Sequence, residues 1–131
     1  MTDITLTTTS RKAFRSRSVG DDWEMTVDAS GDDGPTPNEV LVANYASCFV
    51  AAFRVAARTE DVDNVGQIEI DVTASLDEDD DLAATAFDIR VQSSLRGRDD
   101  AILAEARRIC HVQAALREEL HATISLTDEA F

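Results

Sequence analysis

The chain has 131 residues, enough for one domain with a modest hydrophobic core. It carries 26 acidic and 12 basic residues, for a net charge of −14, and Lys12 is its single lysine. A negative field of this size repels a phosphate backbone, so nucleic acid is not an expected partner. The lysine-poor, acidic balance favours a halophilic protein kept soluble at high salt, where charge repulsion is screened over a few ångströms.

The N-terminal region predicts a small antiparallel sheet. Thr5–Thr9 and Ala13–Val19 are polar and β-prone, and Trp23–Ala29 alternates in polarity after a turn at Gly20-Asp21-Asp22. The region contains no apolar run of the length that an export signal requires. We therefore expect a cytoplasmic protein.

A long apolar helix is predicted over Val40–Ala57, entered through the turn Gly34-Pro35-Thr36-Pro37. Four polar side chains interrupt it: Asn44, Tyr45, Ser47 and Arg54. It is also shorter than the roughly 20 residues of a membrane span, so no membrane association is expected. A helix of this composition is buried on nearly all sides of a protein. Because a chain of this length could hardly cover it alone, we expect a second subunit.

The second half of the chain predicts strands around a further helix. Two strands are joined by an acidic hairpin loop: Gln67–Leu76, Asp77–Asp81 and Thr85–Leu95. A helix from Ala101 to about Leu116 follows, with apolar residues at helical spacing, and a last strand covers Ala122–Thr127. The order of strands and helices predicts a single α+β domain over residues 1–131.

Two cysteines, Cys48 and Cys110, are the candidate reactive groups, since thiols in a cytosolic chain are more often functional than structural. A thiol attacks a peroxide only as thiolate, and an ordinary cysteine with a pKa of about 8.5 is mostly protonated at neutral pH. A cation must therefore approach the reactive thiol, and an arginine held by a carboxylate is suited to this. Tyr45 shares a helix face with Cys48 and either lines a pocket or packs. No zinc-ligand spacing is present, so neither a metal nor a cofactor is expected.

The stretch Gly34–Ala43, followed by Cys48-Phe49, resembles the signature of the OsmC/Ohr family of thiol-dependent hydroperoxide reductases. An Ala-rich helix that ends in Cys110, with Val112 two residues later, matches the family's second site. The order of strands and helices agrees over nearly the whole length. The resemblance implies an OsmC-like fold, with small antiparallel sheets around long buried central helices in an intertwined homodimer.

The resemblance also implies an antioxidant enzyme that reduces organic hydroperoxides under oxidative stress. Cys48 would become a sulfenic acid, and Cys110 would condense with it to a disulfide. An external dithiol of the lipoyl type, or a small thiol, would then regenerate the pair.

The family carries its activating arginine before the Pro-containing turn, where this chain offers Arg15 first and Arg17 second, on one face of an extended strand. The family's acid lies ten residues before the cysteine, and that position is Asn38 here. Glu39 matches a broader branch of the family and either serves the site or caps the helix. Asn38 favours the alternative function, a non-catalytic or redox-sensing protein that binds a small apolar ligand at the dimer pocket.

Overall fold

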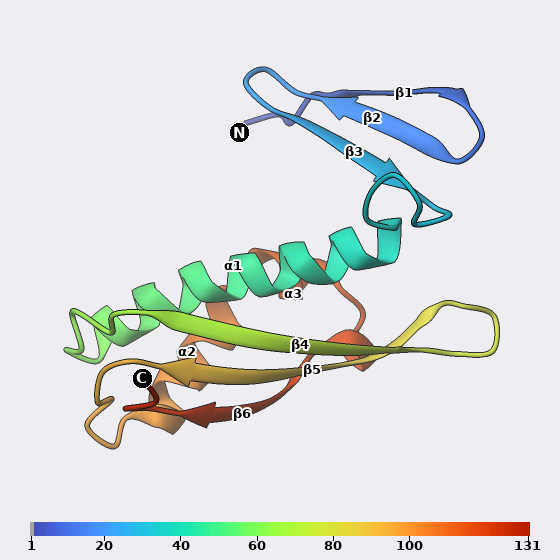
Figure 1. Cartoon of the computed structure of the whole chain (residues 1–131). Helices are drawn as coiled ribbons and strands as arrows, with labels where there is room; N and C mark the ends of the chain where they lie inside the picture. Colours follow the sequence, from blue (N-terminus) through green and yellow to red (C-terminus); the bar gives the residue numbers. More distant parts are fainter. Residues whose placement is uncertain (1) are drawn as a thin grey trace. The chain divides into compact units, whose positions relative to one another are not determined.

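The computed structural model describes residues 2–131, which fall into two compact units (Figure 1). The first unit extends to Leu41 and the second covers Val42–Phe131. One helix, α1 (Pro37–Thr59), begins in the first unit and continues through the second.

The first unit is a three-stranded antiparallel sheet, as the sequence predicts. Its strands are β1 (Thr7–Lys12), β2 (Arg15–Val19) and β3 (Glu24–Asp28), paired in the order β1-β2-β3. The turn between β2 and β3 is closed by a bond from the Gly20 amide to the Trp23 carbonyl, 3.0 Å long. Of residues 2–41, Asp28 alone is buried, so this sheet encloses no hydrophobic core of its own.

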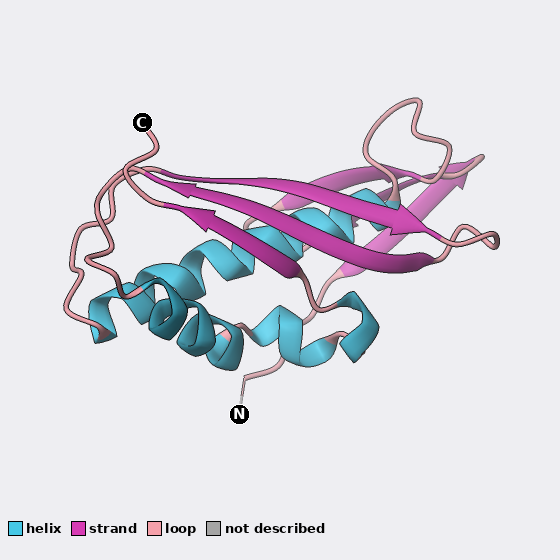
Figure 2. Ribbon diagram, turned by 90° about the horizontal axis from the view of Figure 1, so that it is seen from below, coloured by secondary structure: helices cyan, strands magenta, loops and turns pink. Residues whose placement is uncertain are grey.

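The second unit packs helices on one face of a three-stranded sheet (Figure 2). Its strands are β4 (Ile68–Leu76), β5 (Leu82–Val91) and β6 (Thr123–Thr127), in the order β4-β5-β6. The helices are α1, α2 (Asp99–Ile109) and α3 (His111–Ala115), followed by the single turn η1 (Glu118–Leu120). Alternate apolar residues of β4 and β5 point toward α1 and α2, and this layer is the core of the unit.

Three details differ from the sequence-based predictions. The second sheet is mixed, because β6 pairs parallel to β5 while β4 pairs antiparallel to it. The strand predicted over Thr85–Leu95 starts and ends earlier, since Leu82 already pairs with Leu76 at the end of the hairpin. The helix predicted from Ala101 to Leu116 is interrupted at Cys110, whose backbone is extended, with φ −70° and ψ 110°.

The predicted apolar helix is present as α1, which is longer at both ends. Its buried residues lie on the side that faces the sheet of the second unit: Tyr45, Phe49, Ala52, Phe53, Ala56 and Ala57. The opposite side remains exposed within one chain, with Val55 51% exposed. Among residues 2–131, α1 is the one helix whose length and composition would allow it to cross a membrane, and a third of its most apolar window (33%) is buried. A core helix of a soluble protein meets the same two criteria.

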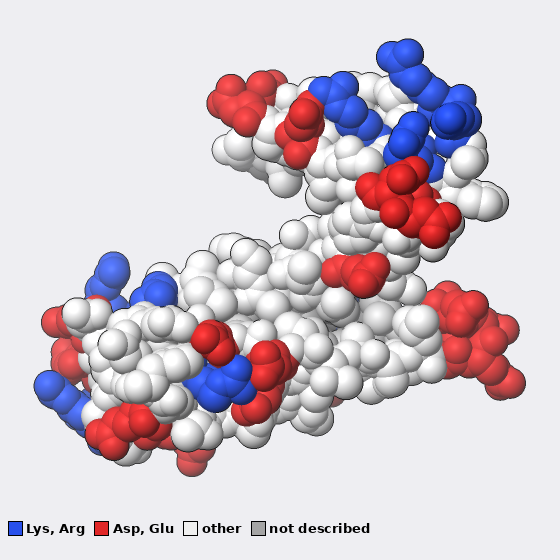
Figure 3. Space-filling model, in the orientation of Figure 1, with Lys and Arg blue, Asp and Glu red and all other residues white. Residues whose placement is uncertain are grey.

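Charges are segregated within each unit (Figure 3). The tip of the β4–β5 hairpin, Asp77–Asp81, is a purely acidic and solvated cluster, as predicted. In the first unit the cations gather on β1 and β2, which carry Arg11, Lys12, Arg15 and Arg17. In a chain with a net charge of −14, this small basic face stands out as a site where an anion or a thiolate could be stabilised.

Candidate active site around two thiols

The two cysteines of the second unit line the same cavity. Both are free thiols, Cys48 half-buried on α1 and Cys110 buried between α2 and α3, and they are close enough for Cys48 to perturb the pKa of Cys110. A cavity of about 540 Å³ opens over them. Most of its other lining residues are small or apolar: Ala51, Ala52, Val55, Ile109 and Ala114. The thiols therefore share one mostly apolar pocket, into which the organic part of a small molecule would fit.

Cys110 occupies the break between two helices. Its amide donates to the Ala106 carbonyl over 3.0 Å and ends α2, and its carbonyl accepts from the Ala114 amide over 3.1 Å and begins α3. Burial raises the pKa of the Cys110 thiol above its ordinary value, and the neighbouring Cys48 raises it further. Backbone N–H groups of Gln113 and Val112 act in the opposite direction on that pKa. Cys110 is consequently a thiol, not a thiolate, at neutral pH.

A buried polar network lies behind Cys110. The Tyr45 hydroxyl donates to Gln113 Oε1 over 2.6 Å and accepts from the Ala122 amide over 2.9 Å. Gln113 Nε2 donates to the Arg107 carbonyl over 3.3 Å, and Arg107 Nη1 donates to the Ala122 carbonyl over 3.0 Å. Burial raises the pKa of Tyr45 above 10.0, so its hydroxyl remains a donor throughout the neutral range.

One arginine of the second unit reaches the rim of the thiol cavity. Arg108 lines it together with His111. Two bonds join the Arg108 guanidinium to the Glu105 carboxylate one helical turn earlier, at 2.9 and 2.5 Å. This bidentate pair lowers the pKa of Glu105 and fixes the orientation of the guanidinium. Arg108 is not among the site residues predicted from the sequence, although its position two residues before Cys110 was a possible signal.

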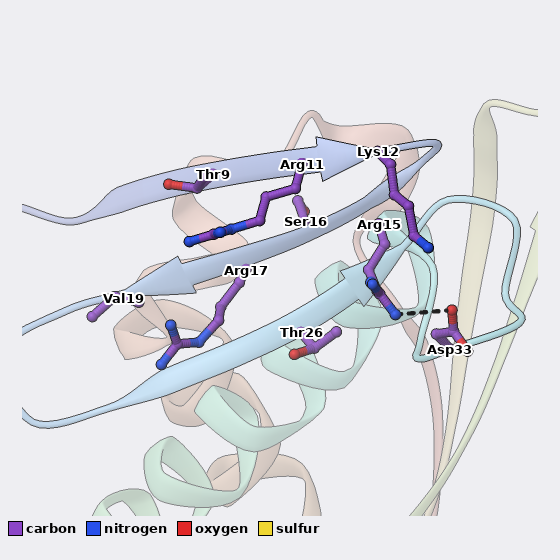
Figure 4. Close-up of a pocket in the computed structure, with 9 residues that line it drawn as sticks. All are labelled: Thr9, Arg11, Lys12, Arg15, Ser16, Arg17, Val19, Thr26 and Asp33. Carbon is purple, nitrogen blue, oxygen red and sulfur yellow. Dashed lines mark hydrogen bonds and ion pairs between the residues drawn. The ribbon is translucent and has the colours of Figure 1, made fainter.

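The predicted activating arginines lie on β2 of the first unit, where they line a basic groove of about 520 Å³ (Figure 4). Arg15 Nη1 donates to Asp33 Oδ2 over 3.3 Å, and Arg17 forms an ion pair with Glu24. Both arginines point to the same face of the sheet, as the strand alternation predicts. An arginine held by a carboxylate is therefore present, and the carboxylate of Arg15 is Asp33.

The loop that carries Asp33 is organised by the buried carboxylate of Asp28. Asp28 Oδ1 accepts from the Ser30 hydroxyl over 2.6 Å and from the Ser30 amide over 2.9 Å, while Oδ2 accepts from the Asp33 amide over 3.1 Å. These bonds, those of Ser30 first, lower the pKa of Asp28 below 3.8. The loop is thus built on an ionised aspartate, and it presents Asp33 to Arg15.

Glu39 forms hydrogen bonds with Thr36 at the beginning of α1. Its Oε1 accepts from the Thr36 amide over 2.9 Å, and the Glu39 amide donates to Thr36 Oγ1 over 3.2 Å, which is a capping box. These bonds lower the pKa of Glu39. Nine residues of helix separate Glu39 from Cys48, about two and a half turns, so the two side chains point to opposite sides of α1. Of the two roles open to Glu39, the geometry favours capping.

The structure thus brings together Cys48 and Cys110 within one unit, and Arg15 and Arg17 on one sheet face. Among residues 2–131 there is no cluster of three or more His, Cys, Asp or Glu side chains that could hold a metal ion. The arrangement supplies two adjacent thiols, an apolar pocket and arginines held by carboxylates, which are the elements of a thiol redox site.

Comparison with known proteins shows which family the chain resembles. Residues 30–125 match the model of the family described as OsmC-like protein. An uncharacterized protein of Haloferax volcanii is 42% identical over the full length of both chains. The organic hydroperoxide resistance protein of Xanthomonas axonopodis pv. citri is 24% identical over 74% of this chain and 70% of its own.

Solved structures share the fold. An OsmC-like protein from Mycoplasma pneumoniae superimposes with a TM-score of 0.77 at 17% identity, covering 97% of each chain. The organic hydroperoxide resistance protein OhrB of Bacillus subtilis superimposes with a TM-score of 0.70 at 22% identity, covering 94% of this chain and 98% of its own. At this level of identity, both similarities show a shared fold and nothing more.

Proposed function

The chain belongs to the OsmC-like protein family, which points to a peroxide-related redox function, and on that premise we propose that it is a thiol-dependent peroxidase that reduces organic hydroperoxides. The position of the Cys48 and Cys110 thiols on the wall of one mostly apolar cavity is the observation that carries this proposal. In the cell the enzyme would act in the cytoplasm as an antioxidant during oxidative stress.

Cys48 is the attacking residue in this mechanism, because it is the less buried of the two thiols. Its thiolate attacks one peroxide oxygen, the O–O bond breaks, and the leaving alkoxide takes a proton to become an alcohol. Cys48 is then a sulfenic acid. The apolar walls of the cavity favour an organic hydroperoxide, because they can cover its hydrocarbon part.

Cys110 is the resolving residue. Its sulfur attacks the Cys48 sulfur, an S–S bond forms, and the S–O bond of the sulfenic acid breaks. The hydroxide released takes up the Cys110 proton and leaves as water. An external dithiol, of the lipoyl type, or a small thiol then reduces the disulfide by thiol–disulfide exchange.

Arg15 is the cation that we assign to thiolate stabilisation, with Arg17 as the second candidate. Support for Arg15 comes from its ion pair with Asp33 and from the Asp28 loop that presents Asp33. A carboxylate partner restricts the guanidinium to one orientation, so that its remaining N–H groups are directed. In this chain Asp33 would replace the acid that the family carries at the position of Asn38, while Glu39 caps α1.

A homodimer completes the proposal, since OsmC-like proteins are generally homodimeric. Two exposed apolar features support it: the uncovered side of α1, which includes Val55, and the sheet of the first unit, where Phe14 is 71% and Trp23 47% exposed. A second copy of the chain would bury surface of this kind, which a soluble monomer rarely leaves uncovered.

The alternative function is a non-catalytic or redox-sensing protein that binds a small apolar ligand in the pocket. Asn38 favours it, because that position lacks the acid of the hydroperoxide-reducing branches. The two functions differ in what a peroxide does to the thiols. A sensor oxidises once and slowly, whereas an enzyme oxidises rapidly and turns over with a dithiol.

The decisive experiment adds stoichiometric cumene hydroperoxide at high salt and follows free thiols and peroxide together. The wild type should consume one peroxide per chain and lose two thiols. Cys48→Ser should abolish both changes, and Cys110→Ser should stop at a sulfenic acid that dimedone traps. The Ser47→Ala variant, one residue from Cys48 and exposed, is the matched control. A reaction no faster than that of free cysteine would reject the peroxidase and leave the ligand-binding alternative.

A further inference from the structure

The Cys110 segment is short and needs support from outside. Helix α3 has only five residues, fewer than a helix needs to be stable by itself, and Gln113 is its one buried residue. Cys110 precedes this helix with an extended backbone. The direction of the Cys110 thiol is therefore set by what holds α3: Val112 and Leu116 pack against the core, and Gln113 supplies the side-chain hydrogen bonds.

The side chain of Gln113 connects α3 to the helix before the break, α2, and to α1. Its Nε2 donates to the Arg107 carbonyl in the last turn of α2, and its Oε1 accepts from the Tyr45 hydroxyl on α1. Tyr45 lies three residues before Cys48, on the same face of α1. The hydrogen bond between Tyr45 and Gln113 thus joins the helix that carries Cys48 to the segment that carries Cys110.

Because this hydrogen bond is buried, it favours a single position of α3 relative to α1. Tyr45 is 1% exposed and Gln113 7% exposed, and each polar atom of the two side chains has a partner. A buried hydroxyl or amide that loses its partner has no water to replace it, so a displaced α3 would leave unpaired groups. The ring of Tyr45 is itself fixed against Phe87, with centroids 4.7 Å apart. The network therefore favours the geometry in which the two thiols line one cavity.

We propose that Tyr45 and Gln113 are a positioning pair that holds Cys110 against Cys48, so that the disulfide closes before a second peroxide can oxidise Cys48 further. The inference rests on the proposed redox function of the two thiols. The two side chains act through the segments that carry the thiols, although the Gln113 backbone N–H lies close enough to Cys110 to lower the pKa of its thiol. They act on the resolution step, in which the S–S bond forms and water leaves, and not on the attack of Cys48 on the peroxide.

The first test measures the effective concentration of the thiol pair in glutathione redox buffers, without any peroxide. We expect Tyr45→Phe, and separately Gln113→Met, to lower the effective concentration about tenfold, the effect of losing one buried hydrogen bond. The effect of the double variant should be clearly smaller than the two single effects combined, because the Tyr45–Gln113 bond is lost in both single variants, while each also loses one bond of its own. Values for both single variants within twofold of the wild type, in folded protein, would overturn the proposal.

The second test separates the two oxidation steps. With cumene hydroperoxide, Tyr45→Phe should form the Cys48 sulfenic acid at the wild-type rate, resolve it about tenfold more slowly, and accumulate more sulfinic acid. Equal slowing of both steps would indicate a merely structural role and would reject the pair.

Ile89→Ala is the matched control, because it truncates a fully buried core residue of β5 without removing a hydrogen bond. It should lower the melting temperature at least as much as Tyr45→Phe and leave the effective concentration within twofold of the wild type. A wild type that fails to consume peroxide would reject the proposed function alone, since the glutathione measurement does not depend on it.

Discussion

The two units differ in how their reactive side chains are held. In Val42–Phe131 the thiols lie against a hydrophobic core of buried aromatic and aliphatic residues, with a satisfied polar network behind Cys110. In the residues up to Leu41, the arginines lie on a sheet whose side chains are mostly exposed, and ion pairs and one aspartate loop hold them. One unit fixes its residues by packing and the other by local electrostatics.

This difference has a consequence for the proposed chemistry. Packing in the core is insensitive to salt and to acid, so the thiol pair should keep its geometry over a wide range of conditions. Exposed ion pairs contribute little to stability and are screened by salt. The orientation of the arginine side chains should therefore depend more on the salt concentration, and on burial of the sheet by a second subunit. Stability and reactivity should therefore respond to different substitutions.

The largest expected effect is on stability, from Phe49→Ala in the core of the second unit. Phe49 is fully buried and its ring packs edge-on against Phe87, 5.6 Å between centroids. Its truncation should lower the free energy of unfolding by about 3–5 kcal/mol, measured by urea denaturation at constant salt. The control is Val19→Ala on β2, which is 38% exposed and should cost less than about 1 kcal/mol.

If Val19→Ala lowered the free energy of unfolding as much as Phe49→Ala, the sheet of the first unit would not depend on local electrostatics alone. Val19 would then be buried against other apolar residues in the folded assembly. Repeating both measurements over a range of protein concentrations would then distinguish a subunit interface, because its contribution falls as the protein is diluted.

The sequence predicted the elements whose signal is local. Alternation in β4 and the apolar run of α1 gave the type and approximate length of each element, and the signature around Cys48 gave the family. The break at Cys110 could not be predicted this way, because no Gly or Pro marks it. The polar network behind the break joins Tyr45 to Gln113, which are 68 residues apart in the chain.

In the candidate site, too, some residues carry a local sequence signal and others do not. Cys48, Cys110, Arg15 and Arg17 were found from residue type and motif position. Asp33 was missed, because its pairing with Arg15 follows from a loop that folds around the carboxylate of Asp28. Loop geometry of this kind depends on side-chain hydrogen bonds that have no periodic pattern in the sequence.

The next largest effect is on reactivity, from Arg15→Met. Removing a cation that stabilises a thiolate should slow the reaction of Cys48 with cumene hydroperoxide about tenfold or more at neutral pH. Thermal stability should change little, because the ion pair is exposed. Stopped-flow measurement of the oxidation step would record the loss of rate, and a thermal melt would record the stability.

Three comparison variants sharpen this prediction. Asp33→Asn should give a smaller loss than Arg15→Met, because the guanidinium remains but is less well oriented. Arg17→Met should leave the rate nearly unchanged if Arg15 is the activating residue, and the reverse pattern would transfer the role to Arg17. Arg108→Met tests the rim of the thiol cavity, and a loss there larger than that for Arg15 would assign the activating charge to the unit that holds the thiols.

The smallest expected effect is a local response to acid that separates the two units without any substitution. The hydrogen bonds from Ser30 lower the pKa of Asp28 in the folded protein below its unfolded value of 3.8. Their contribution to the loop is complete above pH 3.8 and is lost as the pH falls through the lower, folded pKa. The amides of Ser30 and Asp33 should therefore lose hydrogen-exchange protection in that acidic range.

The amide of Ala122 is the internal reference, because it donates to the Tyr45 hydroxyl, whose raised pKa leaves it uncharged throughout the acidic range. It should keep its protection at pH values where Ser30 and Asp33 have lost theirs. In Asp28→Asn the two loop amides should be weakly protected at every pH. Loss of protection at all three amides over one pH interval would show that acid unfolds the chain as a whole, and that packing does not hold one unit while local electrostatics holds the other.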